Sequence, residues 1–300
     1  MKKWFVLSLS LVASMLVMGC SSDSDGGSAP YTVSGEAADI NDKRSAENAV
    51  ATLKSMGLAA DGMSEFNNVI LAEGGSGSPS YLRSVATPRE TLECSGGGSY
   101  TLSGSETETS INGQVAFNAC IEDGETINGT LGLVGTMDNE HNIDLTTTFS
   151  NITIVSMDSS DRINLTMNMQ TNLDTFDPLS LTLRGESKIG QKTYGYENFI
   201  MSVANYNDTL EDFNEYEING KTSFISEDSD FSCANGTYTV STTETMIRDT
   251  TLDGFSSGIV EVNGVTIEFA SGGAATVTYA NGTSQQIHQK NSILCGDLPL

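Results

Sequence analysis

The sequence predicts a mainly β fold: an antiparallel meander sheet, arranged as a curved sheet, a partial barrel or a sandwich, with a short helical segment before it. Two observations predict this fold. From Cys94 onward, apolar and polar residues alternate with a period of two, as in 163–169, where Ile, Leu and Met alternate with Asn and Thr. Such alternation places one face of an antiparallel sheet against a core and the other in water. Asn-Gly and Asp-Gly dipeptides also recur through the region, and both favour two-residue hairpin turns.

The turn dipeptides recur in similar surroundings, which predicts repeated units of a turn followed by a strand. Ile-Asn-Gly occurs three times and Val-Asn-Gly once, each near alternating residues. At ordinary strand lengths of about 5–10 residues, we expect a meander of about ten to twelve strands. The tripeptides lie at 111–113, 127–129, 218–220 and 262–264, and further alternating stretches lie at 143–149, 179–183, 199–203 and 259–269.

Residues 41–57 predict a helix. Ala46, Ala49, Val50 and Leu53 recur at helical spacing, Asn41 or Asp42 is available as N-cap, and Gly57 follows as a stop. A weaker helical pattern covers 64–72, and the Gly-, Ser- and Pro-containing stretch 73–90 reads as a linker. The expected organisation is therefore a helical segment and linker over 41–90 and an antiparallel β domain over 94–300.

The charge balance excludes one class of function. With 14 Lys plus Arg against 39 Asp plus Glu, the net charge is −25, so the chain is not a general nucleic-acid binder. The same balance argues against adhesion to anionic membranes through side chains. Only two histidines are present, which leaves little room for His-based catalysis or for a multi-His metal site. We expect no cofactor.

The first twenty residues carry an export signal. Lys2 and Lys3 precede an apolar stretch that ends in Val17-Met18-Gly19-Cys20. This tetrapeptide resembles the lipobox of bacterial lipoprotein precursors. The resemblance implies a signal peptide over 1–19, diacylglycerol on the Cys20 thiol and an acylated amine, with palmitate as a typical chain. Because Ser21 and not Asp follows the cysteine, it also implies an outer-membrane lipid anchor, and the polar residues 20–40 read as its tether.

Four further cysteines, Cys94, Cys120, Cys233 and Cys295, predict two disulfides in an oxidising compartment. Their number leaves three pairings open. Cys94 and Cys233 each precede a Gly-containing turn and a Tyr-Thr-aliphatic-Ser stretch, which favours the pairs Cys94–Cys120 and Cys233–Cys295. No C-x-x-C motif occurs, so a cysteine metal site is not expected.

One motif suggests catalysis. Residues 254–258 match G-x-S-x-G around Ser256, and Glu268 and His288 follow in the chain order that many hydrolases use. A nucleophile elbow requires a strand-to-helix turn, whereas the residues after Ser256 alternate as in a β-hairpin. The hydrolase interpretation is therefore an alternative and not the main hypothesis. Met167 and Met169 could bind Cu(I), but their place beside Ile163 and Leu165 favours a core role.

Acidic residues cluster in several probable loops. Their default role is a solvated surface that keeps the protein soluble, and weak Ca²⁺ binding is the alternative. The clusters are Glu122-Asp123-Glu125, Asp158 with Asp161, Glu211-Asp212, Glu215 with Glu217, and Glu227-Asp228-Asp230.

Together these observations predict a non-enzymatic lipid-anchored envelope or surface lipoprotein that serves as a structural or binding module. Two alternatives stay open. One is a carrier or sensor of an apolar ligand, held in a curved sheet that the helix at 41–57 closes; a continuous apolar cavity between helix and sheet would support it. The other is a hydrolase that uses Ser256.

Overall fold

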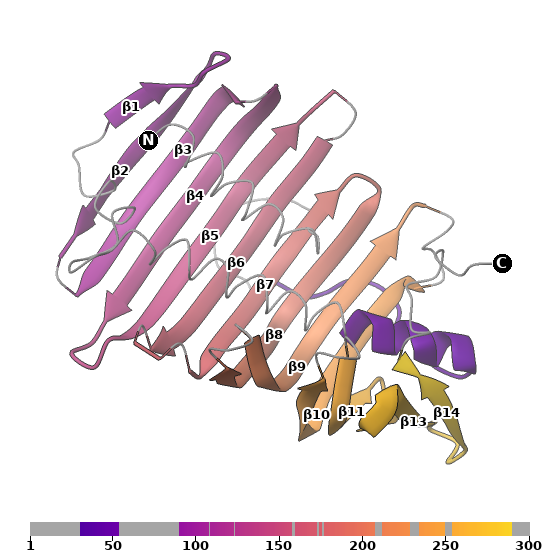
Figure 1. Cartoon of the computed structure of the whole chain (residues 1–300). Helices are drawn as coiled ribbons and strands as arrows, with labels where there is room; N and C mark the ends of the chain where they lie inside the picture. The colour runs from indigo at the N-terminus through magenta and orange to yellow at the C-terminus, as the bar shows by residue number, and fades with distance from the viewer. Residues whose placement is uncertain are drawn as a thin grey trace.

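A computed structural model shows one antiparallel sheet in which each strand pairs with its neighbours in the chain (Figure 1). The model describes residues 31–53 and 90–289, apart from 108, 123, 158–159, 173, 176, 208–211, 229–233 and 250–253. The predicted mainly β meander is confirmed, and the sheet is open, with β1 and β14 at its two edges. It has fourteen strands and not ten to twelve, because β1, β13 and β14 have only four or five residues each, which is too short for a clear periodic pattern.

The strands fall into two groups by length. Strands β3 to β10 have 11 to 16 residues each, whereas β11 to β14 have five to nine. The bounds are β1 Glu90–Glu93, β2 Ser99–Glu106, β3 Ser110–Glu122, β4 Glu125–Met137, β5 Asn142–Val155, β6 Ser160–Asn172, β7 Leu179–Ile189, β8 Lys192–Asn207, β9 Asp212–Ser226, β10 Gly236–Asp249, β11 Gly254–Val262, β12 Val265–Ala270, the 3-10 turn η3 Ser271–Gly273, β13 Ala274–Thr278 and β14 Ser284–His288.

The predicted N-terminal helix is present over 43–53. Asp42 is its cap: the Ser45 backbone N–H donates to Asp42 Oδ1 at 2.8 Å, and the Asp42 N–H donates to Ser45 Oγ at 3.1 Å. The bond from the Ser45 backbone holds the pKa of Asp42 below its ordinary value. The rest of the predicted helix, the weaker helical pattern and the linker lie outside the described residues. None of the helices in the described ranges is long and apolar enough to cross a membrane.

Residues 31–40 lie on the sheet, although their composition predicts the end of a tether. Val33 and Ile40 are buried, and Ala37 forms an isolated parallel bridge with Thr237. The Asn263 side-chain amide also donates to the Ala38 carbonyl at 2.9 Å. The composition of this short segment does not predict its packing, because side chains more than 150 positions away determine it.

The helix fills the concave end of the sheet, where Figure 1 shows it beside β9–β14. Its face of Ala46, Ala49, Val50 and Leu53 is buried in one continuous core with the apolar residues of these strands. Hydrogen bonds also join the residue after β14 to β11 at this end of the sheet. The Gln289 carboxamide, just after β14, accepts from the Phe255 N–H at 2.8 Å and donates to the Phe255 carbonyl at 2.6 Å. Because β12 and β13 separate these two strands in the sheet order, the strands β11–β14 must curl.

The hairpin turns predicted at the Ile-Asn-Gly tripeptides are wrong. Residues 111–113, 127–129 and 218–220 lie inside β3, β4 and β9. β2 and β3 pair with Tyr100 opposite Phe117, and their connection is closed by the Thr107 N–H, which donates to the Ser110 carbonyl at 2.8 Å. The prediction holds at Asn263-Gly264, which joins β11 to β12 with positive φ angles of 51° and 79°.

Two of the Asn-Gly dipeptides lie opposite β-bulges of neighbouring strands, at residues 118–119 of β3 and 198–199 of β8. The Asn128 side chain accepts from the Ala119 N–H at 2.7 Å, and the Asn219 side chain accepts from the Thr242 N–H at 3.0 Å. The glycine that follows has φ of 106° at Gly129 and 116° at Gly220, and an added Cβ would lie 2.3 Å from a carbonyl oxygen of a neighbouring strand, that of Asn151 on β5 or Asn198 on β8. At each of these shifts in strand register, the asparagine supplies a hydrogen-bond acceptor, and the glycine leaves room for the backbone of the neighbouring strand. We call this series of bulges across β3–β10 the bulge line.

Candidate functional site

The long strands have two chemically distinct faces. Paired residues share a face, so Phe149 opposite Leu165 and Met169 opposite Leu181 belong to an apolar face. Met167 and Met169 lie there, which confirms their expected core role. The opposite side, which we call the polar face, carries Thr, Ser, Asn, Gln and charged side chains.

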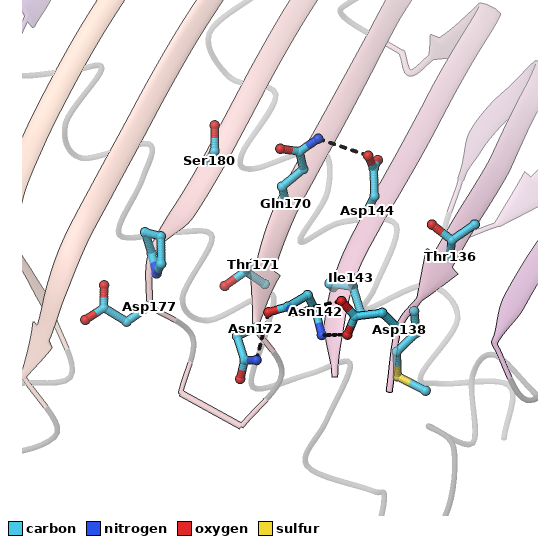
Figure 2. Close-up of a pocket in the computed structure, with 12 residues that line it drawn as sticks. Thr136, Asp138, Asn142, Ile143, Asp144, Gln170, Thr171, Asn172, Asp177 and Ser180 are labelled. Carbon is cyan, nitrogen blue, oxygen red and sulfur yellow. Dashed lines mark hydrogen bonds between the residues drawn. The ribbon is translucent and has the colours of Figure 1, made fainter. Parts of the chain in front are cut away.

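The sheet is hollowed at one end of β4–β7, as Figure 2 shows. Residues of both faces line this groove, because Met137, Ile143 and Thr171 occupy the apolar phase of their strands. One row of residues crosses four strands there: Thr136, Asp144, Gln170 and Ser180 are each opposite the next. The groove has a volume of about 500 Å³. Its lining is Thr136, Met137, Asp138, Asn142, Ile143, Asp144, Gln170, Thr171, Asn172, Asp177, Pro178 and Ser180.

Asp144 is held in the groove by amides of the neighbouring strand (Figure 2). Its Oδ1 accepts from the Asn168 side chain at 2.5 Å, and its Oδ2 accepts from the Gln170 side chain at 2.9 Å. Asn168 also donates to Thr146 Oγ1 at 3.0 Å. Since each carboxylate oxygen has two lone pairs, both retain capacity to accept a further hydrogen bond. The Asp144 carboxylate is thus fixed in position but not saturated.

Asp138 is fixed in the same way at the β4–β5 turn. Its oxygens accept from the Asn142 side chain at 2.9 Å, the Asn142 backbone at 2.9 Å and the Glu140 backbone at 2.8 Å. The hydrogen bond from the Asn142 side chain is the main reason that the pKa of Asp138 lies below its ordinary value. Asn172 extends the network, because its amide donates to Asn142 Oδ1 at 2.9 Å. The Asp138 carboxylate is therefore ionised across the neutral pH range.

A third carboxylate and a histidine complete this end of the sheet. Asp177 accepts from the Asn205 N–H at 3.1 Å, and His141 Nδ1 lies 2.9 Å from Asp174 Oδ2 beyond the groove. Neither lysine nor arginine is among the described residues that line the groove. Three carboxylates without a basic partner in the lining repel anions. The groove suits a neutral ligand with several hydroxyl groups, which donate to carboxylates and amide oxygens and accept from amide N–H groups.

The structure forms one of the two expected disulfides. Cys94 and Cys120 are joined, with 5.4 Å between their Cα atoms. Together with Glu122 they also form a group whose ligand atoms lie within 4.8 Å of one another, but the disulfide occupies both sulfurs. Glu122 accepts from the Ser95 N–H at 2.8 Å and so has a structural role. Cys20, Cys233 and Cys295 lie outside the described residues.

Ser256 lies within the antiparallel strand β11 and not at a strand-to-helix turn. Its hydroxyl donates to the Ile247 carbonyl at 3.3 Å. Glu268 lies within β12, and His288 ends β14. This placement does not support a nucleophile elbow, whose geometry exposes the serine above a parallel sheet.

Several acidic residues of these clusters make local contacts in the described part of the chain. Asp161 accepts from the Gly190 N–H at 2.9 Å, Glu217 from the Thr245 hydroxyl at 2.9 Å, and Glu227 pairs with Lys188 at 2.6 Å. The groove carboxylates belong to none of these clusters, so sequence reasoning missed them. The signal that could have found them is register: Asp144 and Gln170 occupy the polar phase of two strands that pair in the order of the chain.

The fold is an open, single-sheet antiparallel meander with a helix at its curled end, and it carries a groove at one end of β4–β7. Comparisons with protein-family models, with curated proteins and with solved structures find no match to this chain.

Proposed function

We propose that this chain is a non-enzymatic, lipid-anchored lipoprotein of the outer membrane that binds a neutral, hydroxyl-rich ligand, such as a glycan, in the polar groove. The observation that carries the proposal is the preorganisation of the groove. Asp138 and Asp144 are each oriented by two or three donors, so a ligand meets acceptors that are already in position. Preorganised groups cost less conformational entropy on binding than mobile ones.

The anchoring part of the proposal rests on the Val17-Met18-Gly19-Cys20 box. The Cys94–Cys120 disulfide supports it, since disulfides persist in exported proteins and are uncommon in the cytosol. Cells that express the wild type or Cys20→Ala are labelled with radioactive palmitate. We expect label in the wild-type protein and none in the variant; equal labelling would refute the anchor.

The groove is tested with the full-length protein purified from membranes in detergent and applied to an array of neutral and acidic polysaccharides. We expect binding to neutral glycans. Asp144→Asn should weaken it about tenfold or more, because the new amide group faces the amides of Asn168 and Gln170. Glu261→Gln is the matched control, since it makes the same chemical change at an exposed position of β11 outside the groove.

Two results would contradict the glycan proposal. One is binding that Asp144→Asn leaves unchanged. The other is a preference for acidic polysaccharides, which the three groove carboxylates should repel. Loss of all binding on addition of a calcium chelator would instead assign the groove to a divalent cation.

A further inference from the structure

Residues 31–33, at the start of the described N-terminal segment, contact the polar face of the sheet. The Tyr31 hydroxyl donates to Glu186 Oε2 at 2.5 Å, and the Val33 N–H donates to Glu197 Oε2 at 2.9 Å. Glu186 is opposite Gly195 on β8, and an added Cβ on Gly195 would lie 2.9 Å from the Tyr31 hydroxyl. Residues 31–33 therefore lie against the polar side of β7 and β8.

Basic side chains gather around this point. Residues 184, 186 and 188 alternate on β7, so Arg184 and Lys188 share a face with Glu186. Arg162 on β6 is directly opposite Lys188, and Lys221 on β9 is opposite Glu197, to which its amine lies at 3.5 Å. We call Arg162, Arg184, Lys188 and Lys221 the basic patch. Glu186, Glu197 and Glu227 lie among them, so this part of the surface is close to neutral or weakly positive, in a chain whose net charge is −25.

We infer that the basic patch faces the membrane in which the protein is anchored and contacts its anionic headgroups. The inference rests on the proposed lipid at Cys20. Only ten residues separate Cys20 from Tyr31, and a chain of that length spans at most about 40 Å when fully extended. A bilayer within this distance repels a strongly acidic protein least where its basic residues gather. Each Lys or Arg close to an anionic surface contributes favourably, and these attractions add.

This orientation also places the groove. The basic patch lies at the beginning of β6, and the groove lies toward its end: Arg162 and Gln170 are eight residues apart on the same strand, about 26 Å at 3.3 Å per residue. With the basic patch against the headgroups, the groove lies at the opposite ends of the strands, farther from the bilayer. The overall charge of the chain argues against adhesion to anionic membranes through side chains. The basic patch is the local exception, because the fold gathers basic residues there.

The test uses the full-length protein purified from membranes and reconstituted in vesicles of phosphatidylcholine with or without phosphatidylglycerol. A fluorophore is attached at Ser160→Cys, two residues from Arg162, or at Glu140→Cys, near the groove. Quenching by a headgroup-linked quencher should be strong at 160 and weak at 140, and it should require phosphatidylglycerol. Arg162→Gln with Lys188→Gln should reduce the docking equilibrium constant roughly 30-fold, because two favourable charges are removed. Lys43→Gln with Arg44→Gln removes equal charge elsewhere and should change nothing.

Equal quenching at the two positions, or quenching at 160 that survives Arg162→Gln with Lys188→Gln, would overturn the inference. The fraction of protein that floats with the vesicles in a density gradient is measured on the same samples. Protein that floats but fails the quenching test removes this inference and leaves the anchor intact. Protein that does not float refutes the anchor, and the inference falls with it. Glycan binding is measured independently of both.

Discussion

The wide part of the sheet, β3–β8, and its curled end, β11–β14, have the same alternating sequence pattern. They differ in what their two faces contact. In the curled end, Val260, Ile267 and Val277 are fully buried, with 0% exposure, around a helix that is likewise buried on its inner face. In β3 and β4 of the wide part, Val115, Phe117 and Leu133 keep 7–8% exposure, although residues of β7 and β8 such as Leu179 and Phe199 are buried as deeply as those of the curled end. The opposite face of the wide part carries mainly polar side chains.

The difference shows what each part contributes. Short strands curl around a helix and make a core that is closed on several sides, which is where deletion of an apolar group should cost most. Long strands present a wide surface on which residues from four strands align in one row, as Thr136, Asp144, Gln170 and Ser180 do. The curled end thus stabilises the fold, and the wide part carries the groove.

The largest expected effect comes from the helix. Val50→Asp places a carboxylate in the curled core and should lower the free energy of unfolding by about 4 kcal/mol or more, because the buried charge has no partner. Urea unfolding measures the loss, and amide hydrogen exchange locates it: protection should fall first in β11–β13 and last in β4–β6. Lys43→Ala, an exposed residue of the same helix, should change stability by less than about 0.5 kcal/mol. Uniform loss of protection would show that the two regions are one cooperative unit.

The disulfide should act on the other region. Replacing Cys94 and Cys120 together by alanine should cost about 3–4 kcal/mol, because the bridge closes a loop with a sequence separation of 26 and restricts the unfolded chain. Exchange should increase in β2 and β3 while β11–β13 keep their protection. Ser103→Ala in β2 is the control: it changes a residue of the same hairpin but leaves the disulfide intact. Early exchange in the curled end would contradict the proposed separation.

The smallest effect concerns Tyr238 on β10, between the two regions. Burial raises its pKa from 10.0 to about 12, and its hydroxyl donates to the Ala234 carbonyl at 2.6 Å. The folded state therefore holds the proton more tightly than the unfolded state. Stability is fully present below pH 10 and falls by about 2–3 kcal/mol as the pH rises through 12.

Tyr238→Phe separates the titration from the hydrogen bond. At pH 7 the variant should lose about 1 kcal/mol with the hydrogen bond. Between pH 10 and 12 it should lose less stability than the wild type, keeping only the contributions of Tyr100, Tyr194 and Tyr279, whose pKa values burial also raises. Parallel stability curves for the two proteins across this pH range would contradict the role given to Tyr238.

Local sequence predicts some of these features well. Alternation predicts the antiparallel strands and the core role of Met167 and Met169, and the spacing of Ala46, Ala49 and Val50 predicts the helix, because neighbours in the chain determine these properties. The sequence predicts a turn at Asn128-Gly129, but the dipeptide lies inside β4 opposite bulges of β3 and β5. The same dipeptide suits both places, and only the partner strands decide between them. The groove was missed for a related reason: Asp144 and Gln170 meet only through register, which a single sequence does not display.

The bulge line has a consequence for the chemical ageing of the chain. Asparagine followed by glycine deamidates when the glycine nitrogen attacks the asparagine side-chain carbonyl, which requires a freely rotating backbone. At Asn128-Gly129 and Asn219-Gly220 the side-chain oxygen already accepts a hydrogen bond from a neighbouring strand, and the strand ladder restrains the backbone. The Asn281 side-chain oxygen also accepts hydrogen bonds, from the Thr283 N–H and hydroxyl, but Asn281-Gly282 lies in the exposed turn between β13 and β14, where no strand ladder restrains its backbone. Stored at alkaline pH, the folded protein should accumulate isoaspartate at this hairpin tip first, and peptide mapping would reveal the opposite order if the strands gave no protection.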